Sequence, residues 1–411
     1  MIIFIYQLLL DVGYIVFVNK FYSYNEFTLN LSFSRCLFSL LLFVITSFFY
    51  INNSKNNYKP SKIIFNFLIF IYFIPLSTYI KFNQTSLQFI VYSIIYLIIL
   101  FCVINYFPEI YLIKGKKIIL NKYLTILTLI VGIYMIYLSF KYTDFRIIFD
   151  IINVYGIRAE AAAYDLNVIE NIFLSLIGIV VPILIVYFLE KKKYIYSIFL
   201  LIVEYIRFSF DGSKSIFFFL AITIVVYIIY KQKYLKNIGL ILIIVLLIPT
   251  ILIGLSGEGI IFSSLFVRRV MFVPIQASYR YFEFFSEFPI DFCRGGILRR
   301  VGFDTLYQTN IVNTIPLFTH ETFTNYNNGL IGDAMYSFGN LGCVLGPIII
   351  GTMLRFLDGC IYGLKDKIYI PFLIYLAITL TNSNWSTILL SHGFLIVCLL
   401  FAFMERKELD E

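Results

Sequence analysis

Charged residues are scarce in this chain, and histidine is nearly absent. Only 14% of the 411 residues are charged, whereas 60% are hydrophobic. A soluble domain carries about 25% charged and about 45–50% apolar residues, so the composition excludes a soluble globule. With two histidines and no HExxH, CxxC or DxD spacing, a zinc site has few ligands to draw on. We therefore expect no metal and no other cofactor.

Nucleotide-binding motifs are also missing. The chain contains neither GxGxxG nor a phosphate-loop motif, and its lysine-rich connections are short. We expect no use of ATP or nucleotide sugars. The net charge of +8 follows from lysines in these connections, so no nucleic-acid partner is predicted. Of six cysteines only Cys293 falls clearly in an expected outer loop, which argues against a disulfide framework.

Long apolar segments recur along nearly the whole chain. A helix of about 17–25 apolar residues crosses a bilayer, and a spanning backbone must satisfy its own hydrogen bonds. The sequence therefore predicts an all-α, polytopic integral membrane protein with about twelve transmembrane helices. The expected spans are 2–18, 29–51, 63–80, 87–106, 124–140, 169–189, 194–210, 216–230, 237–255, 331–357, 368–381 and 387–404.

The lysines fall in alternate connections between these spans. Cytoplasmic loops carry an excess of Lys and Arg, so those connections and both termini are expected to be cytoplasmic. The opposite face then holds the 141–168 loop, the Asp211–Ser215 turn and one large loop. We expect three regions: helices with a smaller outer loop in 1–255, a large outer loop or lid in 256–330, and helices in 331–411.

A polar, glycine-rich stretch runs without a spacer into an apolar span. It covers Asn325–Gly351 and reads NYNNGLIGDAMYSFGNLGCVLGPIIIG. Such an entrance can hold a polar substrate at the membrane surface, with Asn328 as a candidate ligand. Asp333 is a catalytic candidate, although an acid near a helix start can equally serve as a cap. The later glycines are typical of close helix packing.

The large loop carries six of the 12 arginines. Arginine forks bind phosphate oxygens in pairs, so the loop predicts a site for a lipid-linked phosphate or diphosphate. Six acids in the same loop balance this charge, and ion pairing remains an alternative for each arginine. We also expect an aromatic interfacial helix there, bent at Pro274 and ended near Pro289. The arginines are Arg268, Arg269, Arg280, Arg294, Arg299 and Arg300.

Other candidates lie outside these two stretches or between them. His320 and Glu321 could accept a proton from an acceptor hydroxyl. Arg158 could be a further phosphate ligand or could pair with Glu160, Asp150 or Asp165. One helical face at the end of the seventh span carries four charges that indicate either a functional cavity or an ion-pair ladder. They are Glu204, Arg207, Asp211 and Lys214.

These stretches resemble the O-antigen, or oligosaccharide repeat-unit, polymerases of bacterial surface polysaccharide assembly. The resemblance is carried by the arginine pair before Pro274, by Tyr281–Phe285, and by the series from Asn328 to Gly342 that includes NGLIGD and FGNLG. The DGSKS turn at Asp211–Ser215 is similar to a small polar motif of that family that often contains arginine. Lys214 stands there instead and lacks the bidentate fork.

The resemblance implies a multi-pass glycosyltransferase of the bacterial inner membrane. It would transfer a growing glycan from undecaprenyl diphosphate to the next lipid-linked repeat unit on the periplasmic face, with arginines stabilising the departing diphosphate. Its partners would be the lipid-linked oligosaccharide, membrane lipid, and a chain-length regulator and flippase of the same pathway. Alternatives are an O-antigen ligase, a polysaccharide flippase or other transporter, and a non-catalytic membrane scaffold.

Overall fold

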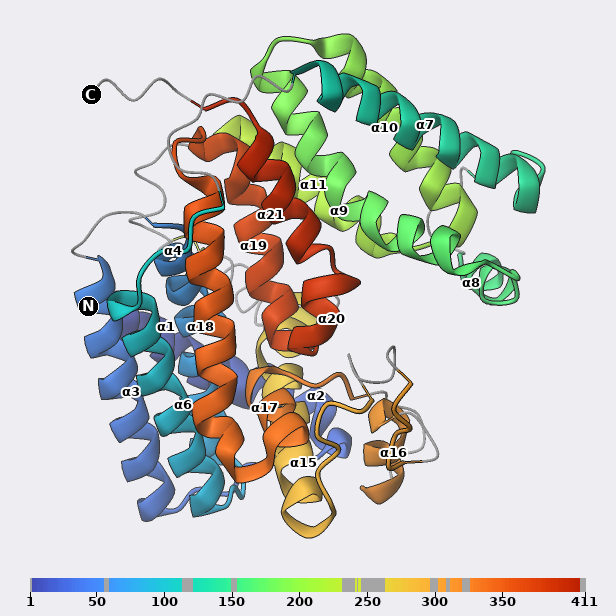
Figure 1. Ribbon diagram of the computed structural model, residues 1–411. Helices are drawn as coiled ribbons and strands as arrows, with labels where there is room; N and C mark the ends of the chain where they lie inside the picture. The colour runs from blue at the N-terminus through green and yellow to red at the C-terminus, as the bar shows by residue number, and fades with distance from the viewer. Residues whose placement is uncertain are drawn as a thin grey trace. The chain divides into compact units, whose positions relative to one another are not determined.

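All regular secondary structure in the described residues is helical, as the composition predicts (Figure 1). The computed structural model describes residues 2–54, 59–112, 121–148, 154–230, 241, 243–244, 263–295, 302–307, 311–319 and 326–406. Among them, eight helices are long and apolar enough to cross a membrane. They are Ile2–Asn25, Phe33–Asn53, Pro60–Phe82, Leu87–Tyr106, Lys122–Thr143, Val168–Glu190, Leu330–Ile361 and Trp385–Phe403.

An α-helical membrane protein is therefore confirmed. The count of about twelve spans and the large outer loop stay predictions, and most of the expected 237–255 span lies outside the described residues.

The chain divides into two compact units. Unit 1 comprises Met1–Glu109, Gln232–Phe356 and Leu376–Thr387, and unit 2 comprises Ile110–Lys231, Leu357–Tyr375 and Ile388–Glu411. The three expected regions concern membrane topology, and they stay predictions too.

Unit 1 begins with four expected spans. The first is α1 (Ile2–Gly13), which continues through a π-helical turn, η1 (Tyr14–Asn19), into α2 (Lys20–Tyr22) and a 3₁₀ turn, η2 (Ser23–Asn25). Three further segments follow, namely α3 (Phe33–Ser54), the run α4–η3–α5 (Pro60–Leu68, Ile69–Phe73, Ile74–Phe82) and α6 (Leu87–Tyr106).

The proline inside the third span explains its irregular centre. Pro75 has no backbone N–H to donate to the preceding turn, and a π-helical turn, η3, lies directly before α5. The same arrangement recurs where η4 (Ser264–Phe272) precedes Pro274 in α15 (Val273–Glu287). Phe288, which precedes Pro289, is extended (φ −111°, ψ 155°), so the helix ends where the sequence indicated.

The α15 helix is a largely buried member of unit 1, and its expected position at the membrane interface stays a prediction. Ten of its 15 residues are buried, and it packs against α17 (Leu330–Phe338), as Figure 1 shows. The packing is close because Gly332 has no side chain, since a Cβ there would come within 3.0 Å of the Ser278 Cα. Aromatic side chains made this helix look amphipathic, but they fill the space between helices.

The polar stretch forms two helices separated by a break. After α17 the chain passes through Gly339, whose φ of +57° and ψ of −138° suit only glycine, and a 3₁₀ turn leads into α18 (Gly342–Ile361). A Cβ at Gly342 would lie 2.1 Å from the Ala334 carbonyl oxygen, and one at Gly351 would lie 2.4 Å from Val103. The glycines thus permit close packing, as predicted.

Unit 2 is built mainly from α7 (Asn121–Thr143), α8 (Tyr155–Ala162), α9 (Val168–Glu190), α10 (Tyr194–Asp211) and α11 (Lys214–Ile229). A capping box starts α9, because the Asn167 side chain accepts from the Glu170 backbone and Glu170 accepts from Asn167. The remaining described helices are α16 (Ile311–Phe318), α19 (Asp366–Asn382), α20 (Trp385–Leu390) and α21 (Phe394–Phe403).

Candidate functional site

Asp333 is the centre of a buried hydrogen-bond network in unit 1. Its Oδ1 atom accepts from the side-chain amides of Asn328, at 3.1 Å, and Asn384. The Ser337 hydroxyl lies 3.5 Å from the same oxygen, and Oδ2 accepts from the Trp385 backbone N–H at 2.8 Å. All of these donors come from the protein itself.

This geometry favours the capping interpretation of Asp333. The Trp385 N–H is the first of α20, so Asp333 caps the start of that helix from α17, whereas the sequence suggested a cap for its own helix. The side-chain amide of Asn328, a predicted substrate ligand, donates its hydrogen bond to the same carboxylate. A carboxylate with so many donors has little capacity left to accept a substrate proton.

Two of the predicted arginines, Arg268 and Arg280, contact the segment at the end of the first span. The Arg268 guanidinium lies 4.2 Å from the centre of the Tyr22 ring, a cation–π contact. Arg280 forms ion pairs with Glu26 and, at 2.6 Å, with Glu283. Between them, the Gln276 amide donates to the Asn25 carbonyl. Arg268 and Arg280 are therefore engaged within unit 1.

Arg269 differs from its neighbour Arg268. Its side chain is exposed, and no ion pair or hydrogen bond to it is recorded among the described residues. Adjacent positions on a helix point about 100° apart, so one arginine of the pair can face the protein while the other faces outward. The sequence could not separate the two, whereas the structure places Arg268 against Tyr22 and leaves Arg269 exposed, with no partner recorded among the described residues.

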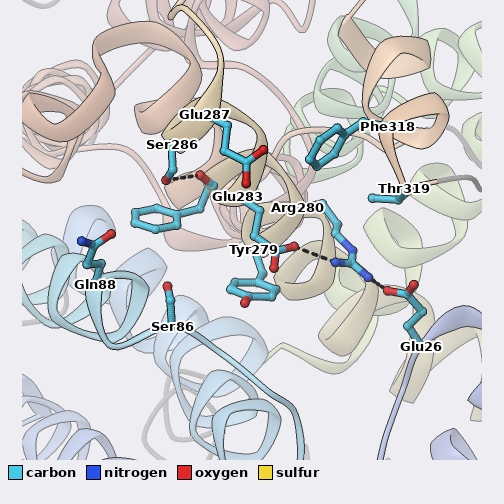
Figure 2. A pocket seen from close by; sticks show the side chains of 11 residues that line it. Glu26, Ser86, Gln88, Tyr279, Arg280, Glu283, Ser286, Glu287, Phe318 and Thr319 are labelled. Atoms are coloured by element: carbon cyan, nitrogen blue, oxygen red, sulfur yellow. Dashed lines mark hydrogen bonds and ion pairs between the residues drawn. The ribbon is translucent and has the colours of Figure 1, made fainter.

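A pocket of about 360 Å³ lies beside Arg280 (Figure 2). Its wall combines residues of α15, the start of α6, the Glu26 turn and the end of α16. Figure 2 shows Arg280 between the carboxylates of Glu26 and Glu283, with Glu287 and Phe318 above it in this view. The remaining lining residues are Ser86, Gln88, Tyr279, Phe282, Ser286 and Thr319.

The charge in this pocket is mainly negative. Three carboxylates face one guanidinium, and Glu287 is exposed. Burial raises the pKa of the Tyr279 hydroxyl, and the Glu283 charge raises it further, so this group stays protonated at neutral pH. Glu26 reaches Arg280 from a left-handed backbone conformation with φ of 61°, which ends the η2 turn. Such a conformation is uncommon outside glycine, asparagine and aspartate.

The chain after α15 is held to α17 by Asp291. This buried carboxylate accepts from the Tyr336 hydroxyl at 2.8 Å, from the Leu306 N–H at 3.1 Å, and from the Gly295 N–H. Arg294 lies in this turn and is partly exposed. The remaining loop candidates, Arg299, Arg300, His320 and Glu321, lie outside the described residues, so their roles stay predictions.

Arg158 lies in unit 2, against the turn that resembles the polar family motif. Its Nε atom donates to the Gly212 carbonyl at 2.9 Å, while Glu160 pairs with Arg146 at 2.8 Å. Glu160 is therefore not the partner of Arg158. Lys214 begins α11, but its side chain lies outside the described part of the structure. Arg158 and the backbone of this turn are thus neighbours within unit 2.

A buried charge pair lies in the same unit. Glu204 is fully buried, and its nearest carboxylate oxygen lies 3.5 Å from the Arg207 Nη1 atom. Neither Glu204 oxygen has a hydrogen-bond partner in the described structure. Gly178 makes room for the guanidinium, since a Cβ there would lie 1.7 Å from Nη1. The structure thus describes one ion pair on the charged face of α10, and the expected ladder of four charges stays a prediction.

Several residues of these sites could not be chosen from the sequence. The sequence indicated Glu283 and Glu287 only as loop acids that balance the arginine charge. Nothing in the sequence indicated Glu26, and Asn384 carries no motif. The sequence signals for the pocket were Arg280 and the aromatic stretch Tyr281–Phe285 within the resemblance. Comparisons of the chain with protein-family models, with curated proteins and with solved structures found no match.

Proposed function

We propose that this protein is a membrane glycosyltransferase that polymerises lipid-linked oligosaccharide repeat units of a bacterial surface polysaccharide. The donor would be a glycan on undecaprenyl diphosphate, and the acceptor would be the next lipid-linked unit. The observation that carries the proposal is the η4–α15 helix. It presents an exposed arginine, Arg269, for which no partner is recorded in the described part of the chain, and eleven residues later, at Arg280, it lines a polar and aromatic pocket.

In the proposed reaction, an acceptor hydroxyl attacks the anomeric carbon of the donor glycan. The glycosidic bond forms as the bond to the diphosphate oxygen breaks, and the hydroxyl proton leaves to a base. Arg269 would stabilise the negative charge that develops on the diphosphate, because a preorganised guanidinium does so most strongly where water is excluded. Glu321 and His320 remain candidates for the base, since Asp333 is occupied by internal donors.

A deletion strain tests the proposal. Loss of a polymerase leaves surface glycan with a single repeat. Loss of a ligase leaves polymer on the lipid carrier, whereas loss of a flippase leaves no repeat at the surface. Gel analysis of the surface glycan, with mass spectrometry of the lipid extract, separates these outcomes. The first pattern supports the proposal, and either of the others contradicts it.

Complementation of that strain with Arg269→Ala tests the residue. We expect polymer formation to fall by a factor on the order of 10²–10³, the cost of removing one donor to a developing oxyanion. Arg269→Lys should recover part of this loss, because charge is kept but the fork is lost. Arg406→Ala, which changes an arginine bonded to its own helix, is the matched control. Full polymer from Arg269→Ala would contradict the assigned role.

The buried Glu204–Arg207 pair favours a transporter as the second candidate. Ionisable residues inside a membrane bundle commonly mark ion or substrate pathways. A transporter would fail in the deletion strain by accumulating lipid-linked units with no surface repeat. It would also be sensitive to replacement of this pair and tolerant of Arg269→Ala, which is the reverse of the pattern expected for a polymerase.

A further inference from the structure

The pocket beside Arg280 differs in charge from what a phosphate site requires. We propose that it binds an uncharged, hydroxyl-rich segment of the glycan, and that the diphosphate binds at Arg269 instead. This inference rests on the proposed function and names the substrate part that the pocket takes. It also gives Arg280 a different task from Arg269, although both arginines were expected to contact phosphate.

The charge of Arg280 is already neutralised. Its guanidinium contacts Glu283 at 2.6 Å and also pairs with Glu26, and only about 15% of the side chain is exposed. Glu287 adds a third carboxylate to the wall. With the three acids ionised, the wall carries more negative than positive charge. A diphosphate placed there would meet like charges at short range, which weakens binding of the wrong ligand.

The same groups suit a sugar. An ionised carboxylate only accepts hydrogen bonds, and sugar hydroxyls are donors. The Ser286 and Thr319 hydroxyls already donate to backbone carbonyls and can still accept, whereas the Gln88 amide can both donate and accept. The pocket volume of about 360 Å³ falls within the usual range of roughly 300–1,000 Å³ for small-ligand sites.

Aromatic rings complete the pocket. Phe318 and Tyr279 border the opening, as Figure 2 shows, and the negative face of such a ring attracts the polarised C–H groups of a sugar. The Phe318 ring is fixed by edge contacts with Phe284 and Phe288, with ring centres 5.3 and 5.5 Å away. A fixed aromatic wall beside carboxylate acceptors is chemistry for a neutral carbohydrate.

The distance between the two arginines fits this division. Arg269 and Arg280 are eleven residues apart on one continuous helical segment, which corresponds to a rise on the order of 15 Å. A diphosphate is too short to bridge that distance, whereas a diphosphate joined to an oligosaccharide is long enough. The pocket would then hold sugar rings away from the reacting anomeric carbon and keep the chain in position.

Two binding measurements on the full-length protein in lipid nanodiscs test this inference. Saturation-transfer NMR would use a panel of neutral methyl glycosides, and phosphorus NMR would use inorganic pyrophosphate. We expect Glu287→Gln to weaken glycoside binding by about tenfold, the effect of one hydrogen bond to a charged group, and to leave pyrophosphate binding unchanged. Arg269→Ala should do the opposite. Glu190→Gln, which alters a carboxylate of unit 2, is the control.

Removing negative charge from the pocket makes the test sharper. The double variant Glu26→Gln, Glu283→Gln frees the Arg280 guanidinium, so pyrophosphate affinity should rise by about tenfold while glycoside binding falls. If Arg280→Gln abolishes pyrophosphate binding in the otherwise unaltered protein, the pocket is a phosphate site and the inference is wrong. Failure of every glycoside in the panel to show saturation transfer would overturn it as well.

The results also separate this inference from the proposed function. If the deletion strain loses polymer but the Glu287→Gln and double variants bind and polymerise normally, the pocket assignment fails and the polymerase proposal stands. If glycosides bind at the pocket but deletion leaves polymer unchanged, the pocket assignment stands and the polymerase proposal fails.

Discussion

Asp333 in unit 1 and Glu204 in unit 2 are both buried carboxylates, but their surroundings differ. Asp333 accepts from two side-chain amides and one backbone N–H, and these bonds join two separate parts of unit 1, the α17 segment and the start of α20. Glu204 has one cation at 3.5 Å and no hydrogen bond recorded in the described structure. The first carboxylate is satisfied by the fold, whereas the second depends on a single opposite charge.

The difference shows that burial alone does not identify a reactive acid. A buried charge is stable when hydrogen bonds replace its lost water, and an ion pair without such bonds regains little of its desolvation cost. Asp333 therefore behaves as a structural joint between α17 and α20. Glu204 and Arg207 form a local ion pair whose guanidinium occupies the space left by the missing side chain at Gly178.

The largest effect is expected from Asp333→Ala. Three donors, one buried and two partly buried, lose their acceptor at about 1–3 kcal/mol each, so the free energy of unfolding should fall by about 4–6 kcal/mol. Asp333→Asn keeps one carbonyl acceptor and should fall between this variant and the original protein. Thermal unfolding in detergent measures both. Unchanged stability together with lost polymer would make Asp333 catalytic and remove the contrast with Glu204.

A smaller effect is expected from replacing both members of the unit 2 pair. Glu204→Leu with Arg207→Met should change stability by no more than about 1 kcal/mol or raise it, because apolar groups avoid the desolvation cost of the pair. Glu204→Leu alone should be clearly destabilising, since it leaves Arg207 buried without its counter-charge. If the double variant is as unstable as the single variant, the pair itself stabilises unit 2.

Gly178 provides a matched control for the same prediction. Gly178→Ala should cost about 1–3 kcal/mol in the original protein, because its Cβ would overlap the guanidinium. With Arg207→Met present, the same change should cost less, and a double-mutant cycle measures this coupling. Equal costs in the two backgrounds would show that Gly178 is needed for a reason other than Arg207.

Most helices of this fold could be predicted from hydropathy. The expected span 87–106 coincides with α6, and 169–189 differs from α9 by one residue at each end. Spanning helices are readable because apolar length alone defines them. The interior breaks were less readable. The π-helical turns before Pro75 and Pro274 depend on how the chain relieves a missing N–H, and the burial of α15 depends on its fit against α17.

The candidate site was predicted less completely, for a physical reason. The sequence identifies residue types, but it cannot distinguish an arginine that faces a partner from an adjacent arginine that faces outward. Arg268 and Arg269 are alike in sequence and differ only in orientation. The Arg280 pocket combines Glu26 with residues more than 250 positions later, and a contact at that separation leaves no local pattern.

The smallest effect is expected from an exposed carboxylate, Glu160, which completes the comparison. The hydrogen bond from Arg146 lowers the pKa of Glu160, and Glu160 is about 45% exposed. An unfolded glutamate has a pKa of about 4.3, so the folded state binds fewer protons near that pH. The resulting stabilisation is present above about pH 4.3 and is lost as the pH falls through the lowered folded pKa. Screening by water keeps this contribution below about 1 kcal/mol.

The difference in melting temperature between the original protein and Glu160→Gln should therefore shrink from pH 7 to pH 3.5, and Arg146→Gln should reproduce that change. A difference that grows on acidification would show that protonated Glu160, and not its ion pair, stabilises α8.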